Sequence, residues 1–189
     1  MSLEDGRLQG LPPIADASCR ILILGSMPGA LSLEKQEYYG HPRNHFWKLL
    51  YAIFGSRDAV GGYADPSGLY DERLAFALQN GIALWDVLAE CEREGSLDTA
   101  IRKPEANDFG TFFRTYPGIG RVYFNGQAAS ELYRKQVLPQ LQKLGLGETI
   151  VYQTLPSSSP ARAMSLEAKL ESWRMLGRTG DGSQEVEQA

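Results

Sequence analysis

The chain has 189 residues, 43% of them hydrophobic and 22% charged, which suits one well-packed domain that does not depend on disulfides or metals. Its two cysteines, Cys19 and Cys91, lie far apart, which argues against a metal cluster and fits a reducing cytoplasm. No apolar run reaches the roughly 18 to 20 residues that cross a bilayer, and residues 1–5 lack a signal-peptide pattern. We therefore expect a soluble, cytoplasmic monomer that has no contact with a membrane.

The formal net charge of −4 is unevenly distributed along the chain. Residues 1–10 carry −1 and residues 179–189 carry −3, so the remaining body is close to neutral. We expect a flexible N-terminus over residues 1–10, a single domain over 11–178 and a disordered acidic tail over 179–189. A neutral body can carry a local basic face, so the acidity weakens the case for a nucleic-acid partner without excluding it.

Four apolar segments predict buried strands, and each ends in a short turn that carries polar or glycine residues. The strands and their turns are Ile21–Leu24 before Gly25–Gly29, Ile82–Trp85 before Asp86, Val122–Phe124 before Asn125–Gly126, and Thr149–Leu155 before Pro156–Pro160. The carboxyl ends of parallel strands line one edge of a sheet, and ligands bind in the crevice there. The four turns should therefore meet at one pocket.

Helical spacing fills the intervals between these strands. It is clearest over residues 43–55, where Phe46, Leu49, Leu50 and Ile53 recur at three and four residues. Further helices are predicted at about 68–80, 105–115, 127–144 and 165–176, with Pro139 kinking or splitting the fourth; the glycine-rich stretch 55–68 indicates a surface loop. Alternating strands and helices predict an α/β fold, a three-layer α/β/α sandwich with a central four-stranded, mainly parallel sheet.

The first turn, Gly25-Ser-Met-Pro-Gly29, allows backbone amides to approach a ligand closely. It lacks the Lys and Ser/Thr of a P-loop and the third glycine of a dinucleotide fingerprint, which counts against a nucleotide cofactor. A tight strand-to-helix connection would have the same sequence, so this turn alone does not indicate a ligand site.

The segment Tyr38-Tyr-Gly-His-Pro-Arg-Asn-His-Phe-Trp47 is more informative. A planar ligand could stack on Tyr39 while Asn44, near the start of a helix, orients a water molecule against it. The alternatives are structural: Asn44 could only cap the helix, His41 could be a hydrogen-bonded structural residue, and the tyrosines could belong to the core.

Together, these turns and this segment resemble the motifs of the uracil-DNA glycosylase superfamily. The similarity is greatest to its hypoxanthine (deoxyinosine) DNA glycosylase branch, followed by the mismatch-specific thymine/uracil glycosylases. It extends roughly from Ile21 to Trp173, and the string His41-Pro-Arg-Asn-His-Phe-Trp47 is its most specific part.

The resemblance assigns a role to each turn. Met27 stands where the mismatch-specific members have a water-positioning Asn. The resemblance to the hypoxanthine branch implies that the catalytic amide comes instead from the Asn of His-Pro-Arg-Asn, which is Asn44 here. Asp86 stands where many members read the base with an Asn, and Ser157 replaces a family His. The resemblance implies base binding by Gly25, Ser26, Met27, Pro28, Gly29, Tyr39, Asp86 and Asn125, and DNA binding by Ser32, His41, Arg43, Ser157, Ser158, Ser159, Pro160 and Arg162.

The implied reaction is hydrolysis of the N-glycosidic bond of a deaminated base, hypoxanthine and/or uracil, flipped out of DNA. A placed water suffices, so the enzyme should be monofunctional, leave an abasic site, and need neither cofactor nor metal. An ionised Asp86 would accept hydrogen bonds but not donate them. In a prokaryote we expect association with the nucleoid.

Two other functions remain open. A non-catalytic nucleic-acid or nucleobase-binding protein would explain Met27 and Ser157, whereas a nucleoside hydrolase would have no use for the Ser157–Pro160 turn. Further cations flank the motifs and could contact phosphates or simply form a solvated face; these are Lys48, Lys169, Arg174 and Arg178.

Overall fold

The computed structural model describes residues 6–57 and 62–178. Its centre is a parallel sheet of four strands in the order β3-β2-β6-β7, which are β2 (Ile21–Gly25), β3 (Ile82–Asp86), β6 (Arg121–Asn125) and β7 (Val151–Leu155). Gly25 pairs with Asp86, and Asn125 pairs with Leu155. The predicted polar turns therefore emerge along one edge of the sheet.

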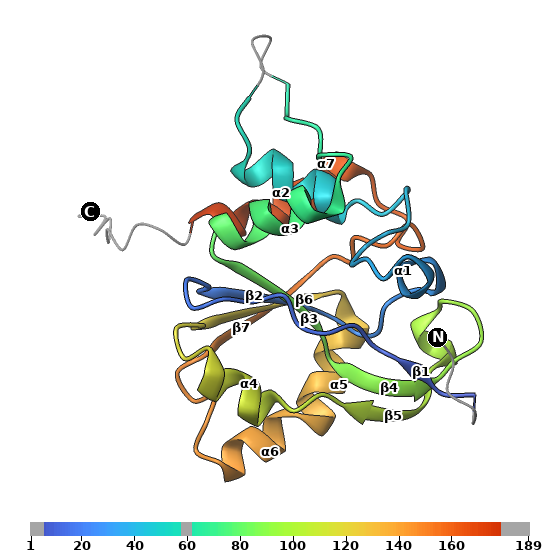
Figure 1. The fold of residues 1–189 in the computed structure, drawn as a ribbon, viewed down its shortest axis with the longest axis vertical. Helices are drawn as coiled ribbons and strands as arrows, with labels where there is room; N and C mark the ends of the chain where they lie inside the picture. Colours follow the sequence, from blue (N-terminus) through green and yellow to red (C-terminus); the bar gives the residue numbers. More distant parts are fainter. Residues whose placement is uncertain (1–5, 58–61, 179–189) are drawn as a thin grey trace, which may run out of the picture.

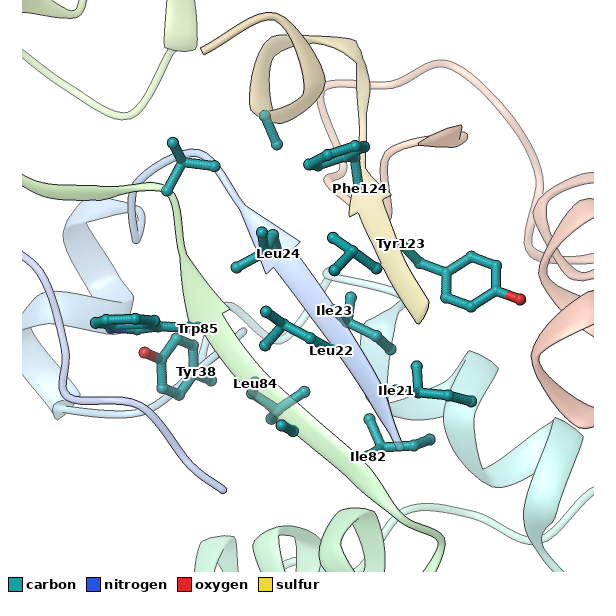
Figure 2. Close-up of a cluster of buried hydrophobic side chains, with 14 of the residues drawn as sticks. Ile21, Leu22, Ile23, Leu24, Tyr38, Ile82, Leu84, Trp85, Tyr123 and Phe124 are labelled. Carbon is teal, nitrogen blue, oxygen red and sulfur yellow. The ribbon is translucent and has the colours of Figure 1, made fainter. Parts of the chain in front are cut away.

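The central strands form because their residues are apolar on both faces. Every residue of β2 and β3 is buried, as expected for a parallel sheet that is covered on both sides. Figure 2 shows side chains from β2, β3 and β6 gathered in one cluster. Because the strands are held in this core, the turns that follow them are held at the carboxyl edge of the sheet.

Helices cover both faces of the sheet, which confirms the predicted three-layer α/β/α architecture (Figure 1). One layer contains α2 (Phe46–Phe54), α3 (Tyr70–Gln79) and α7 (Leu166–Trp173). The other contains α4 (Phe109–Thr115), α5 (Gln127–Gln136) and α6 (Leu138–Lys143). A short helix, α1 (Ala30–Lys35), follows the first turn, and a 3₁₀ segment, Arg174–Arg178, follows α7.

Two predicted helices begin later in the structure than in the sequence interpretation. The helix expected from residue 43 starts at Phe46, because residues 41–44 form a turn closed by a hydrogen bond from the Asn44 amide to the His41 carbonyl (2.9 Å). The helix expected from residue 105 starts at Phe109, where Asp108 accepts a hydrogen bond from the Thr111 amide and caps it. The predicted break near Pro139 separates α5 from α6.

A second sheet was missed by the sequence interpretation. It is antiparallel and contains β1 (Leu8–Gln9), β4 (Leu88–Glu92) and β5 (Arg102–Ala106), in the order β1-β4-β5. A 3₁₀ turn, Asp98–Ala100, lies in the β4–β5 connection. The expectation of a flexible N-terminus over residues 1–10 is wrong for Leu8 and Gln9, which pair with Cys91 and Glu90.

Parts of the remaining predictions fall outside the described residues. These are residues 1–5, the tail 179–189 and residues 58–61 of the predicted loop 55–68. Arg57 and Tyr63 form an isolated antiparallel bridge on either side of that gap. Among the described residues, no helix has the length and apolar character needed to cross a membrane.

Candidate active site

A cavity of about 320 Å³ lies at the carboxyl ends of the parallel strands. All of the predicted site residues except Arg43 and Arg162 line it. The structure thus brings together the first turn, the segment 39–44, Asp86, Asn125 and the turn 157–160, as predicted from the strand order. It adds residues that sequence reasoning missed, among them Ser96 and Asp98.

The first turn is held by the β4–β5 connection. The Ser26 hydroxyl donates to Asp98 Oδ1 (2.5 Å), the Arg93 guanidinium donates to the Pro28 carbonyl, and the Ala30 amide donates to Ser96 Oγ (2.9 Å). Met27 is almost fully buried and forms part of the apolar core. No periodic pattern in the sequence marks residues 93–98, so only the fold reveals their contact with this turn.

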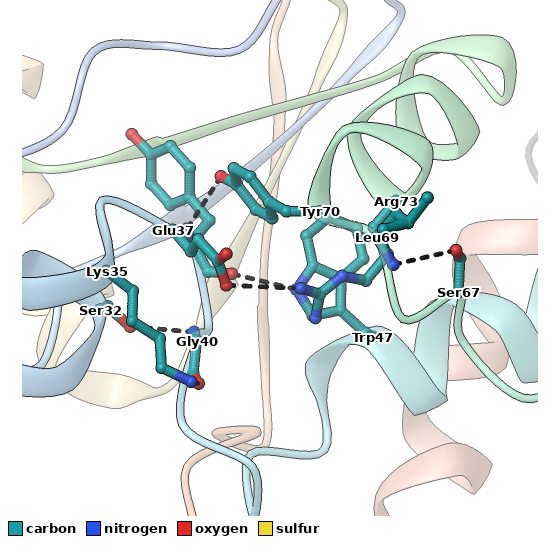
Figure 3. A network of polar contacts seen from close by, with 10 residues as sticks. Ser32, Lys35, Glu37, Gly40, Trp47, Ser67, Leu69, Tyr70 and Arg73 are labelled. Carbon is teal, nitrogen blue, oxygen red and sulfur yellow. Dashed lines mark hydrogen bonds and ion pairs between the residues drawn. The ribbon is translucent and has the colours of Figure 1, made fainter.

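A network of polar contacts fixes the segment that carries Tyr39 (Figure 3). Glu37 pairs with Arg73 (3.4 Å), and the Tyr38 amide donates to the Tyr70 hydroxyl (2.9 Å). The Gly40 amide donates to Ser32 Oγ (3.0 Å). Ser32 is therefore almost fully buried and hydrogen-bonded within the protein, although it lines the cavity, and its contact with DNA stays a prediction.

The two tyrosines have different environments. The Tyr38 hydroxyl donates to the Pro12 carbonyl (2.9 Å) in the core. Tyr39 has a left-handed backbone with φ of 55°, and its ring stacks on Phe46 with centroids 3.8 Å apart. Its hydroxyl is buried without a hydrogen-bond partner among the described residues. Burial raises the pKa of this hydroxyl, with Asp86 as a second cause, so Tyr39 stays protonated.

Asn44 lines the cavity and also supports a helix. Its Oδ1 accepts a hydrogen bond from the Phe46 amide (2.9 Å) at the start of α2. A carboxamide has two donor hydrogens and two acceptor lone pairs, and this bond uses one acceptor position. The capping role and the water-binding role, which were alternatives in the sequence, are therefore compatible in the structure.

Asp86 is 3% exposed, and its Oδ2 has no hydrogen-bond partner among the described residues. Its Oδ1 packs against Gly25, so a β-carbon at residue 25 would push the Asp86 carboxyl group out of its position. Burial, followed by the Asp98 carboxylate, raises the pKa of Asp86 to about 7, while Arg93 acts to lower it. A carboxyl group with a pKa raised in this way can donate a hydrogen bond when it is protonated, whereas the ionised form considered from the sequence only accepts.

The last turn is tied to β6. Asn125 Nδ2 donates to Ser158 Oγ, and the Ser158 amide donates to Asn125 Oδ1, both at 2.8 Å. Ser158 is fully buried and also lines the cavity, so its contact with DNA stays a prediction. Gly126 has φ of 104°, and Ser157 would lie 3.0 Å from a β-carbon placed there, which explains the Asn-Gly pair.

Helix α7 supports the same turn from behind. Lys169, predicted as a possible phosphate contact, is fully buried and donates to the Ser159 carbonyl (3.0 Å). Trp173 Nε1 donates to the Pro156 carbonyl (2.9 Å).

Arg43 and Arg162 are exposed and do not line the cavity. Among the described residues, no group of three or more His, Cys, Asp or Glu side chains could hold a metal ion.

Comparison with known proteins matches this architecture to one family. The family model described as the uracil DNA glycosylase superfamily matches residues 12–177. A protein of Methanosarcina barkeri (strain Fusaro / DSM 804) named "Hypoxanthine DNA glycosylase" is 39% identical over 166 residues, which cover 87% of this chain and 94% of that protein. A protein of the same name from Methanosarcina acetivorans is 36% identical over 170 residues, 90% of this chain and 98% of that protein.

A solved structure agrees with these sequence matches. A solution NMR structure from Methanosarcina acetivorans, titled "a putative Uracil DNA glycosylase", has a TM-score of 0.67 and 34% sequence identity, and the match covers 90% of this chain and 98% of that chain. The sheet order, the cavity at its carboxyl edge and these similarities lead to one conclusion: the chain belongs to the uracil DNA glycosylase superfamily.

Proposed function

We propose that this protein hydrolyses the N-glycosidic bond of a deaminated base, hypoxanthine and/or uracil, flipped out of DNA, with a water molecule held by Asn44. As a member of the superfamily the chain is a DNA glycosylase, and two relatives bear the name "Hypoxanthine DNA glycosylase". The proposal includes action as a cytoplasmic monomer on DNA that contains a deaminated base.

The observation that carries this proposal is the convergence of Asn44, Tyr39 and Asp86 on one cavity. Ligand pockets usually have volumes of about 300–1,000 Å³, so a cavity of about 320 Å³ suits a single extruded base. Tyr39 supplies an aromatic face, Asp86 a hydrogen-bonding edge, and Asn44 an amide for water. Flipping costs a few kcal/mol and is cheapest for mispaired bases, which favours deaminated substrates.

The side chains in the cavity fit a monofunctional reaction. Glycosidic cleavage passes through a sugar with oxocarbenium character, so a placed water and a stabilised leaving base are sufficient. Among the described residues that line the cavity there is no lysine that could form a Schiff base with the sugar. The product is then an intact strand with an abasic site.

The test is excision from matched oligonucleotides that contain hypoxanthine, uracil, xanthine or an undamaged base. Alkali should cleave the product strand only after base release, and without alkali the strand should stay intact. Asn44→Ala should slow release by a factor of about 10² or more, the scale of losing a positioned polar catalyst. Full activity in Asn44→Ala would refute the assignment of the water to Asn44.

Asn44→Ser separates catalysis from helix capping. Loss of the cap in Asn44→Ala should cost about 0.5–2 kcal/mol of stability, and serine caps about as well as asparagine. Asn44→Ser should therefore recover the melting temperature while excision remains slow, because the shorter side chain does not reach the same water. A wild-type protein that binds the oligonucleotides but releases no base would support a non-catalytic binding protein instead.

A further inference from the structure

The β4–β5 connection brings a second carboxylate to the cavity. Asp98, from the 3₁₀ turn in this connection, lines the same cavity as Asp86 and accepts a hydrogen bond from Ser26. Ser26 follows Gly25, the residue against which Asp86 Oδ1 packs. Two acidic residues from different parts of the chain therefore lie next to the first turn, and both line the cavity.

The burial of Asp86 makes its ionised form unfavourable. The side chain is 3% exposed, its Oδ2 has no hydrogen-bond partner among the described residues, and no ion pair involving it is seen there. A buried carboxylate without a paired cation is costly and takes up a proton instead.

In the part of the chain that the structure describes, four titratable or charged groups interact with Asp86. Asp98 favours its neutral form, and Arg93 opposes it. The hydroxyls of Tyr38 and Tyr39, whose pKa values are raised by burial, remain protonated and uncharged. Arg93 donates through Nε to the Gly95 carbonyl and through Nη2 to the Pro28 carbonyl, whereas its Nη1 is buried without a hydrogen-bond partner among the described residues.

We propose that Asp86 meets the extruded base as a neutral carboxylic acid and donates its proton to the leaving base, and that Asp98 is a positioning residue that favours this protonated form. The inference rests on the proposed glycosylase function. As the bond from the sugar carbon to the base nitrogen breaks, its electron pair leaves on the base. The Asp86 proton passes to a keto oxygen or ring nitrogen of the base.

The remaining steps balance this transfer. The water at Asn44 adds its oxygen to the sugar carbon and releases one proton to solvent, from which the Asp86 carboxylate is protonated again. The base thus leaves as a neutral molecule, and the sugar stays in the DNA strand as a neutral abasic site. Leaving-group protonation also explains why an aspartate can serve where many members of the superfamily carry an amide, because a neutral carboxyl both donates and accepts hydrogen bonds.

The inference predicts a specific pH dependence of excision. The pKa of Asp86, about 7, lies above its ordinary value, so the active protonated form predominates at low pH and is lost as pH rises through about 7. Single-turnover excision by the wild type should therefore fall roughly tenfold per pH unit above that point. Asp86→Asn keeps a donor and an acceptor at every pH but has no proton to transfer, so it should be slower and lack this alkaline decline.

Asp98→Asn isolates the contribution of the second carboxylate. It keeps an acceptor for Ser26 but removes the charge, so the alkaline decline should move to lower pH by roughly half a unit or more. Glu94→Gln is the matched control, because it removes a charge from an exposed position in the same connection that does not line the cavity. Its profile should coincide with that of the wild type.

A measurement without DNA distinguishes failure of this inference from failure of the proposed function. The ¹³C carboxyl resonance of Asp86, assigned by its loss in Asp86→Asn, should titrate near pH 7 in the wild type and at lower pH in Asp98→Asn. Titration of Asp86 near pH 4, or a wild-type alkaline decline that persists in Asp86→Asn, would overturn the inference while excision itself stands. Absence of excision at every pH would overturn the proposed function, and the role in catalysis with it.

Discussion

Tyr39 belongs both to the core and to the cavity. One face of its ring stacks on Phe46, at an interplanar angle of 16°, and the residue also lines the cavity. The sequence left these as alternatives because an aromatic residue before an apolar helix fits either. The polar network around Glu37 and Gly40 holds the left-handed turn that allows both contacts at once (Figure 3).

Two substitutions of Tyr39 should distinguish the contribution of its ring from that of its hydroxyl. Base–aromatic stacking is worth roughly 1–3 kcal/mol, so Tyr39→Ala should slow excision about ten- to a hundredfold in single-turnover assays. Tyr39→Phe keeps the ring and removes a buried hydroxyl that has no partner among the described residues, so it should stay near the wild-type rate with equal or higher thermal stability.

Tyr38→Phe is the control for this prediction. It removes a hydroxyl that donates to backbone carbonyls in the core, so it should lower the melting temperature. Because it leaves the Tyr39 ring in place, it should slow excision much less than Tyr39→Ala does. If folded Tyr39→Ala excised at the wild-type rate, the base would not stack on Tyr39 and the ring would serve the core alone.

At the scale of elements, the long apolar runs were predictable and the small antiparallel sheet was not. Strands β2 and β3 consist of consecutive buried residues between turn signals, a pattern typical of parallel strands. Strand β5 has the sequence Arg-Lys-Pro-Glu-Ala, is largely exposed, and lies at the edge of its sheet. Only pairing with β4 makes it a strand, and that pairing depends on tertiary structure.

Dependence on tertiary structure also explains which site residues could be predicted from the sequence. Residues that directly follow the parallel strands, such as Asp86 and Asn125, could be located from strand order alone. Ser96 and Asp98 reach the cavity through the β4–β5 connection, whose path no local pattern predicts. The inward orientation of Ser32, Ser158 and Lys169 could not be predicted either, because polar residues in turns are usually exposed.

Helix α7 and the turn 157–160 should act as one unit in DNA binding. Lys169 holds the Ser159 carbonyl from inside the protein, whereas Arg162 is exposed just beyond the turn. Lys169→Met should weaken DNA binding about tenfold by releasing the turn, a loss of about 1.4 kcal/mol, with no change in salt dependence. Arg162→Ala should reduce the slope of log affinity against log salt by about 1, the effect expected for loss of the one phosphate contact that we predict for Arg162.

Lys143→Ala is the control for both variants. Lys143 is exposed at the end of α6, in the layer across the sheet from α7 (Figure 1). Its loss should change neither the affinity nor the slope when binding is measured by fluorescence anisotropy across a salt series. A reduced slope in Lys169→Met would contradict the role of Lys169 as a support of the turn. An unchanged slope in Arg162→Ala would contradict the predicted contact of Arg162 with a phosphate.

For the whole molecule, the net charge of −4 opposes approach to an anionic duplex. Among the described residues, a few exposed cations lie close in sequence to residues that line the cavity, among them Arg43, Lys48 and Arg162. Local phosphate contacts must therefore act against the charge of the rest of the chain. Residues 179–189 contribute −3 of that charge, and their effect can be predicted from charge alone.

Removal of residues 179–189 changes the formal charge from −4 to −1. At about 50 mM salt, where screening is weak, the truncated protein should associate with DNA several-fold faster, and at about 1 M salt, where the Debye length is about 3 Å, the difference should vanish. Replacing Asp181, Glu185 and Glu187 by their amides should have the same effect at full length. Stopped-flow measurements of the association rate test this prediction. A faster association that persists at high salt, or that the amide variant does not show, would mean that the tail acts through something other than its charge.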